Sequence, residues 1–301
     1  MHDNIRDREK NTGRGYFLVI MAALFFSCQT IFGKVMIRWG LGGLDVTCYQ
    51  YCVAAFVMVM LSLLGKRKEI VTEARGNLKG LLLMGVLSVV TTSCVYLSLE
   101  TVNAGIASML LFTNPVFICL FFMLTGIRKI GIWNRMAVIA ALLGSMLVLN
   151  VFGISSSEIS LTGVLFGVAS SVSYAAYNVF FDLKLSRLST FTSVFYTQGV
   201  AALIIVAVRY RAFFYIADFT PEMILFIVAA SVITCLLPVF FLFRGIAVIG
   251  SEKAGVVAVS ELPITLIIAF LFLGETLERI QIAGIAVVVA AVLVLQKENQ
   301  I

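Results

Sequence analysis

The chain has 301 residues, of which 61% are hydrophobic and only 13% are charged, and its mean hydropathy is +1.05. Soluble domains carry about one quarter charged residues, so this composition excludes a water-soluble globule. Apolar runs of about 20 residues recur along nearly the whole sequence. Each run is long enough to cross a hydrocarbon layer of ~30 Å as a helix. We therefore expect an all-α integral membrane protein without a separate soluble domain.

The net charge of +6 does not indicate a nucleic-acid partner, because the basic residues stand in short clusters between apolar runs. The six cysteines all fall inside apolar segments, where we interpret them as small hydrophobic residues rather than as disulfides or metal ligands. The first apolar run is longer than the apolar core of a signal peptide and lacks a clear cleavage site. We expect it to remain in the mature protein.

In chain order, ten apolar segments bounded by charged or turn residues predict transmembrane helices. They cover about residues 15–37, 44–64, 78–99, 103–125, 132–151, 160–183, 190–208, 222–246, 254–274 and 279–296. Five of the 22 Lys and Arg residues then fall on the side away from the N-terminus, namely Lys34, Arg38, Arg209, Arg211 and Arg279. This asymmetry satisfies the positive-inside rule when both termini are cytoplasmic, and we predict that orientation.

The chain matches itself when it is shifted by 148 residues. Without a gap, Gln50 falls on Gln198 and Pro115 falls on Pro263. A shared glutamine and a shared proline inside apolar segments indicate two related halves of five helices each. Because each half has an odd number of helices, the second half must be inverted relative to the first. This inverted repeat is typical of secondary transporters and predicts a central site between the halves, near the middle of the bilayer.

Several motifs lie at the ends and centres of these segments. The first segment ends in Ser27, Gln29, Gly33 and Lys34, the fourth contains Asn114-Pro115, the ninth contains Glu261-Leu262-Pro263 and ends in Leu273-Gly274-Glu275-Thr276-Leu277, and the tenth contains Gly284. With these motifs the chain resembles the ten-helix EamA family of the drug/metabolite transporter superfamily over essentially its whole length. The resemblance implies a cytoplasmic tail (1–14), two EamA repeats (15–152 and 153–296) and a second cytoplasmic tail (297–301). It also implies export across a membrane, which we expect to be a bacterial inner membrane.

The two matched prolines are the first candidates for the central site. Each removes a backbone N–H donor near the middle of a segment and frees a carbonyl one turn earlier, near Leu111 and Val259. In hydrocarbon such a carbonyl must be satisfied by protein, water or substrate. We predict that Pro115 and Pro263 kink their helices and line a cavity; the alternative is a kink that serves packing alone.

The sixth segment predicts an aromatic face. Tyr174, Tyr177, Asn178 and Phe181 have the spacing of one helical face, which suits a cavity wall. The alternative is packing, with Asn178 in an interhelical hydrogen bond. Further substrate-binding candidates are Gln29, which matches Tyr177 in the repeat, and Tyr96, Asn114 and Ser260.

Glu261 is the only carboxylate near the centre of any predicted span. An ionisable group at that depth is a functional candidate by default, so we predict that Glu261 binds substrate or exchanges protons. The alternative is a glutamate hydrogen-bonded to a neighbouring helix. Lys34 and Arg244 are the candidate basic residues for coupling or gating, with snorkelling to the interface as the alternative for both.

These features favour a secondary active transporter over an enzyme. His2 is the only histidine, and no Walker A motif is present, so neither a histidine-dependent reaction nor an ATP-driven pump is expected. We expect no cofactor and no metal. The prediction is alternating access with export of a small metabolite such as an amino acid or a derivative, with protons as a candidate coupling ion. The alternatives are efflux of lipophilic cationic drugs and, with less support, a channel.

The predicted topology can be tested by cysteine labelling. Ser156 lies in the connection between the two halves, which the charge asymmetry places outside the cell. A Ser156→Cys variant should react with a membrane-impermeant thiol reagent from the outside only. Labelling from the cytoplasmic side alone would contradict both the helix count and the inverted repeat.

Overall fold

The computed structural model describes residues 2–65, 67–102, 104–150, 160–212, 219–273 and 278–297, and their regular secondary structure is entirely helical. The helices, with η marking π-helical segments, are α1 (His2–Phe26), α2 (Gln29–Arg38), α3 (Gly43–Leu63), α4 (Arg67–Arg75), α5 (Leu78–Thr101), α6 (Ala104–Leu111), α7 (Asn114–Thr125), α8 (Ile132–Val148), α9 (Leu161–Phe180), η3 (Phe181–Leu185), α10 (Thr190–Arg209), α11 (Pro221–Ser231), η5 (Val232–Leu236), α12 (Leu237–Ile249), α13 (Ser251–Ala258), α14 (Glu261–Leu273) and α15 (Arg279–Lys297). Ser156 of the topology prediction lies outside the described residues.

Within the described residues these helices form the ten predicted spans, which confirms the integral membrane fold. Seven stretches are long and apolar enough to cross a membrane, and α8 and α15 are shorter apolar helices. The remaining span consists of α13 and α14, which follow each other in the chain. Large apolar side chains such as Phe17, Phe56 and Leu203 stay more than half exposed, as expected for surfaces that face lipid.

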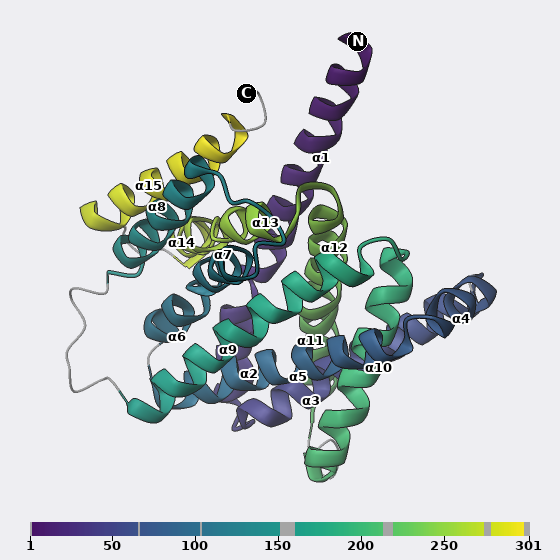
Figure 1. Cartoon of the computed structure of the whole chain (residues 1–301). Helices are drawn as coiled ribbons and strands as arrows, with labels where there is room; N and C mark the ends of the chain where they lie inside the picture. Colours follow the sequence, from purple (N-terminus) through teal and green to yellow (C-terminus); the bar gives the residue numbers. More distant parts are fainter. Residues whose placement is uncertain are drawn as a thin grey trace.

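The two halves of the chain interlock rather than sit side by side. The most extensive contacts join α8 to α15, α5 to α9, α1 to α12 and α3 to α10, and each pair takes one helix from each half (Figure 1). In the repeat, α5 corresponds to the span that contains α12, and α9 corresponds to α1. The pair α5–α9 is therefore the counterpart of the pair α1–α12. The packing therefore has the pseudo-two-fold pattern of an inverted repeat.

The bundle has two ends, which we name by the chain segments that lie there. The terminal side carries the beginning of α1, the end of α15, and helix α4 between α3 and α5. Tyr16 on α1 donates a hydrogen bond from its hydroxyl to the carbonyl of Leu295 on α15, at 3.2 Å, so the first and last spans are joined there. The opposite side carries the connection between α2 and α3 and the end of α10.

Three predicted helices are broken rather than continuous. The first span is interrupted between Phe26 and Gln29. There the hydroxyl of Ser27 donates to the backbone carbonyl of Leu24, so a side chain competes with the backbone N–H groups for this acceptor. The sequence predicts kinks at the two prolines, and both spans are interrupted just before them, although neither proline is among the residues that line the cavity. One helix ends and another begins, with Pro115 and Pro263 in the first turns of α7 and α14.

Two further differences concern the ends of helices. Helix α1 begins at His2 rather than near residue 15, so it continues through the polar N-terminal segment. Helix α4 lies between the second and third spans, where no helix was predicted, because its nine residues are too polar for an apolar run. Ile70 and Ala74 of α4 are buried, which shows that it packs on the bundle.

Helices α8 and α15 approach each other closely at Gly284. A Cβ atom at this position would lie 2.5 Å from the backbone nitrogen of Val148 and 2.9 Å from the carbonyl oxygen of Gly144. Both neighbours are backbone atoms, which cannot move away without separating the helices. Small residues at such crossings are the usual basis of close helix packing in membranes.

Gly284→Leu should therefore lower the unfolding free energy by about 1–3 kcal/mol, the usual cost of overpacking. The control is Ala286→Leu on the exposed face of the same helix, which should have a small effect. Thermal unfolding of the two purified variants in one detergent compares them. Equal melting temperatures would show that α8 and α15 are not in backbone contact.

Candidate functional site

A cavity of about 70 Å³ lies in the middle of the bundle, where the interrupted helices meet. Its polar lining residues are Gln29, Gln50, Tyr51, Ser88, Thr91, Thr92, Tyr174, Tyr177, Gln198, Thr234, Cys235 and Glu261, and its apolar ones are Phe26, Val95, Leu111, Phe112, Val239 and Ala258. Both halves of the chain contribute to the lining. The cavity therefore has the central position between the repeats that the sequence predicts.

Gln50 and Gln198, which match each other in the repeat, both form hydrogen bonds with the π-helical segment η5. Gln50 donates from Nε2 to Thr234 Oγ1 at 3.2 Å, and Gln198 donates from Nε2 to the carbonyl of Cys235 at 3.0 Å. Pro238 follows η5 and lacks the N–H that would continue the helix ladder. Gln198 thus satisfies a backbone carbonyl of this irregular segment, as hydrocarbon requires, and Gln50 holds the side chain of Thr234.

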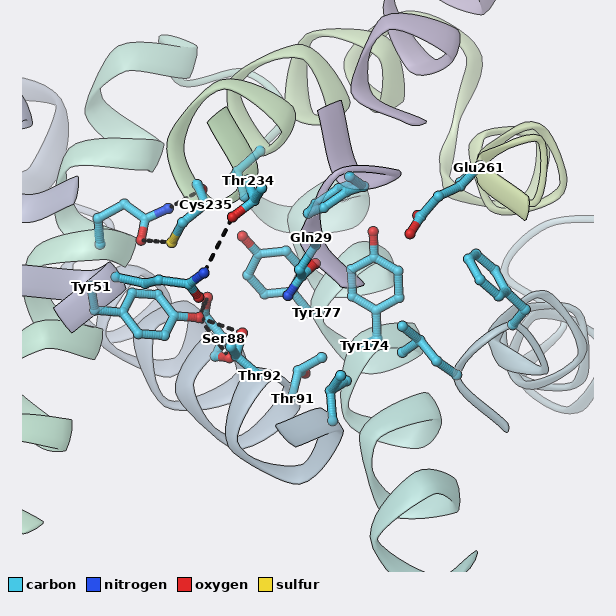
Figure 2. A pocket seen from close by; sticks show the side chains of 18 residues that line it. Gln29, Tyr51, Ser88, Thr91, Thr92, Tyr174, Tyr177, Thr234, Cys235 and Glu261 are labelled. Atoms are coloured by element: carbon cyan, nitrogen blue, oxygen red, sulfur yellow. Dashed lines mark hydrogen bonds between the residues drawn. The ribbon is translucent and has the colours of Figure 1, made fainter. Parts of the chain in front are cut away.

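Tyr51 anchors one end of the cavity (Figure 2). Its hydroxyl lies 2.8 Å from both Ser88 Oγ and Thr92 Oγ1. Tyr96, which was predicted to bind substrate, is fully buried beside this group and donates to Gln50 Oε1 at 3.2 Å. Tyr96 thus holds the side chain of Gln50, which lines the cavity. Tyr96 itself is not among the lining residues.

Tyr174 and Tyr177 form an aromatic wall, as the face of the sixth segment suggests. Their rings are nearly parallel, with an interplanar angle of 19° and centroids 6.2 Å apart. The Tyr177 hydroxyl is buried and has no hydrogen-bond partner among the described residues. It is thus available to a polar group that enters the cavity.

Glu261 is the first residue of α14 and points its carboxylate toward Tyr174, across the cavity from Tyr51 (Figure 2). Within the described part of the chain, no hydrogen bond or ion pair reaches this carboxylate. The beginning of a helix carries a partial positive charge, which favours an anion at that position. The site therefore combines one available carboxylate with aromatic faces and neutral hydrogen-bonding groups.

The backbone near Pro115 behaves as the sequence predicts. The carbonyl of Leu111, which Pro115 leaves without its helix donor, accepts from Asn114 Nδ2 at 2.9 Å and from Ser171 Oγ at 3.2 Å. The protein itself thus satisfies this carbonyl. Near Pro263, the carbonyl of Val259 accepts from the N–H of Leu262 at 3.1 Å.

The structure places several predicted site residues outside the cavity lining. Asn114 and Asn178 are buried nearby, and each has a side-chain oxygen with no partner among the described residues, as does the Ser260 hydroxyl. Phe181 stacks on Phe243 with ring centroids 3.8 Å apart, on the terminal side of the cavity. These four residues surround the cavity without lining it.

Arg244, one of the two predicted basic residues, is not among the residues that line the cavity. Arg244 is exposed on α12, with its guanidinium 5.7 Å from the ring centroid of Phe240. This position fits the snorkelling alternative. Lys34 belongs to α2, and its side chain lies outside the described residues. No group of three or more His, Cys, Asp or Glu side chains in the described part of the chain is arranged to hold a metal ion.

Comparison with known proteins agrees with this geometry. A model of the EamA-like transporter family matches the chain twice, over residues 13–150 and 161–296. The chain belongs to the EamA-like transporter family. An uncharacterized transporter of Clostridium kluyveri is 22% identical over 95% of the chain and 94% of its own length. The inner membrane transporter YicL of Salmonella typhimurium is 21% identical over 96% of the chain and 97% of its own length.

A solved crystal structure has the same fold. It superposes with a TM-score of 0.73 at 14% sequence identity, covering 95% of this EamA-like transporter and 97% of the other chain. At this identity the likeness concerns the fold alone. The family and the fold together establish an integral membrane transporter.

Sequence reasoning missed most of the neutral polar lining of this EamA-like transporter. Ser88, Thr92 and Thr234 are single hydroxyl residues in apolar runs, and their rotation about the helix axis decides whether they face the cavity or a neighbouring helix. Gln50 and Gln198 were noticed only as matches in the repeat. An amide at mid-membrane depth that recurs in both halves is a signal that could have identified them.

Two tyrosine variants distinguish a supporting hydroxyl from an available one. Tyr51→Phe should lower the unfolding free energy by about 1 kcal/mol, because it leaves the hydroxyls of Ser88 and Thr92 without their partner. Tyr177→Phe should leave the melting temperature unchanged or slightly raised, because its hydroxyl has no bond to lose. Thermal unfolding without added ligand provides the comparison; a larger loss in Tyr177→Phe would contradict the assignment.

Proposed function

We propose that this EamA-like transporter is a secondary active carrier that works by alternating access and exports a small metabolite with a cationic amine, such as an amino acid or a derivative. The observation that carries the proposal is the Glu261 carboxylate, which faces the cavity without a partner among the described residues. An ammonium group would neutralise it. The hydroxyls and amides at the other end of the cavity suit a carboxylate or another polar group.

The size of the cavity supports a small substrate. Its volume of about 70 Å³ is far below the roughly 300–1,000 Å³ of pockets that enclose drug-sized ligands. Alternating access accounts for the central position of the cavity, because rocking of one set of helices against the other exposes a midplane site to each side in turn.

One observation favours a second candidate function. The ring of Tyr174 stands next to Glu261, and the Tyr177 ring lies beyond it; aromatic faces near a carboxylate are the usual environment for a lipophilic cation. Efflux of such cations is the alternative. It requires the cavity to widen considerably from the volume that the structure shows.

The proposed setting is a bacterial inner membrane with both termini in the cytoplasm. The basic residues concentrate on the terminal side, which supports this orientation. Protons are the proposed coupling ion, with Glu261 as the group that exchanges them.

A thermal-shift panel on purified protein tests the substrate class. Amino acids, the amines formed from them by decarboxylation, and tetraphenylphosphonium should be compared, because bound ligands raise the melting temperature. We expect at least one amino acid to stabilise the protein more than its amine does. A shift with tetraphenylphosphonium alone would support the cation alternative and contradict the amino-acid proposal.

Glu261→Gln keeps the shape of the side chain but removes its charge. For the amino acid that gives the largest thermal shift, we expect at least tenfold weaker binding, since a hydrogen bond to a charged group contributes about 1.5–3 kcal/mol. The matched control is Glu278→Gln, whose exposed carboxylate accepts from Asn150 on the opposite side and lies away from the cavity. Unchanged binding in Glu261→Gln would show that this carboxylate does not hold the substrate.

Transport in reconstituted vesicles separates the two roles of Glu261. If Glu261 exchanges protons only, the Gln variant should lose accumulation driven by a pH gradient but keep exchange of substrate for substrate. If Glu261 binds the amine, both modes should be lost. A variant with the parent's pH profile in both modes would make Glu261 a structural residue.

A further inference from the structure

A group of three charged residues joins three separate elements on the terminal side. Arg128, in the connection after α7, places Nη1 3.0 Å from Asp182 Oδ2 of η3 and also contacts the carboxylate of Glu252 on α13. The Arg128 side chain is 37% exposed, whereas Asp182 and Glu252 are only 7% and 8% exposed. The group thus lies largely inside the protein.

Asp182 also holds the beginning of α13. Its Oδ2 atom accepts from the backbone N–H of Ser251 at 2.9 Å and from the Ser251 hydroxyl at 2.8 Å. Asp182 therefore caps a helix of another span. Helix α13 is eight residues long and ends at the break before Glu261, so one short helix connects the residue that Asp182 caps to the cavity carboxylate.

Gly250 makes room for this arrangement. Its φ of +83° lies in the region that favours glycine, and a Cβ atom there would lie 2.7 Å from Arg128 Nη1 and 2.8 Å from a carboxylate oxygen of Glu252. A side chain at this position would displace the guanidinium. The turn before α13 therefore requires glycine at position 250 for Arg128 to reach both carboxylates.

One guanidinium serves two nearly buried carboxylates. Partial burial disfavours the charge on Arg128, but Glu252 and Asp182 outweigh this effect and raise the pKa of Arg128. Without Arg128, two like charges would remain close together with little access to water. Removing one partner from a buried ion pair is strongly unfavourable for this reason.

Buried side chains cover the cavity on this side. Beyond Tyr177, the stacked rings of Phe181 and Phe243 are buried, and the charged group lies further toward the terminal side. Several lining residues of the cavity itself, among them Gln29, Val95 and Tyr174, are partly exposed. The charged group thus joins the elements that close the terminal side.

The three charged residues are not repeated in the sequence of the other half. The shift of 148 residues places Asp182 on Lys34, Glu252 on Ala104 and Arg128 on Thr276. An inverted repeat with identical halves would have two equivalent end states. These three differences distinguish the terminal side of the protein from the opposite side, where the ion pair of Arg209 with Asp45 joins other helices.

We propose that Arg128, Asp182 and Glu252 form a latch that keeps the terminal side closed at rest and positions α13, and through it Glu261. They are positioning residues, which act through α13 and do not touch the substrate. Opening toward the terminal side requires Arg128 to separate from at least one of the carboxylates. The proposal rests on the alternating-access part of the proposed function, but its test needs no substrate.

The test measures access to one cavity position from each side of the membrane. Ala258→Cys is introduced at the cavity surface, in a chain whose six native cysteines are replaced by alanine or serine. A membrane-impermeant maleimide is then applied to vesicles of each orientation. Val71→Cys, exposed on α4, is a separate reporter that identifies the terminal side.

Arg128→Gln should raise the rate of Ala258→Cys modification from the terminal side at least tenfold and lower the rate from the opposite side. General loosening or unfolding would raise both rates, so the reciprocal change distinguishes a latch from a merely structural contact. Exchanging the charges, in Arg128→Glu with Glu252→Arg, should restore the parent's rates at least in part.

The matched control is Arg209→Gln, which removes the ion pair of Arg209 with Asp45 on the opposite side. That pair has similar exposure but joins α10 to α3, so its loss should not raise modification from the terminal side. Unchanged rates in Arg128→Gln, or equal increases from both sides, would overturn the latch. If every variant is modified from one side only, alternating access itself fails, and the latch fails with it.

Discussion

Backbone polar groups in hydrocarbon must find their partners within the protein, and the architecture of this transporter depends on that constraint. Interrupted helices are tolerable only where side chains or a polar cavity replace the missing backbone bonds. The breaks at residues 27–28, 112–113 and 259–260 and the π-helical segment η5 all meet at the central cavity. The irregular backbone and the cavity are thus two consequences of the same requirement.

The replacement partners are supplied across the repeat interface. The hydroxyl of Ser171 in the second half donates to the backbone carbonyl of Leu111 in the first, and Gln50 of the first half donates to the hydroxyl of Thr234, which itself donates to the backbone carbonyl of Ala230. Each half therefore completes the hydrogen bonding of the other. The most extensively packed helix pairs, such as α5–α9 and α1–α12, likewise combine helices of different halves.

The two halves share a fold, but they differ in charge. Glu261 falls on Thr113 in the repeat, and Thr113 forms a neutral hydrogen bond with Ser171, with 2.8 Å between the hydroxyl oxygens. Among its described lining residues, the cavity thus has one carboxylate rather than a symmetric pair. Differences of this kind let a pseudo-symmetric protein bind an asymmetric substrate and prefer one end state.

The sequence by itself determined the membrane fold, the ten spans, the two related halves and the prominence of Glu261, because hydropathy, repeated residues and a lone mid-span carboxylate are visible without knowing which helices touch. It also indicated the aromatic wall of Tyr174 and Tyr177 from their helical spacing. Only the tertiary structure decided that Pro115 and Pro263 begin new helices, that Phe181 and Arg244 lie away from the cavity, and that Asp182 caps α13. These outcomes depend on how each helix is rotated and which neighbour satisfies its backbone, and residues far apart in the chain set both.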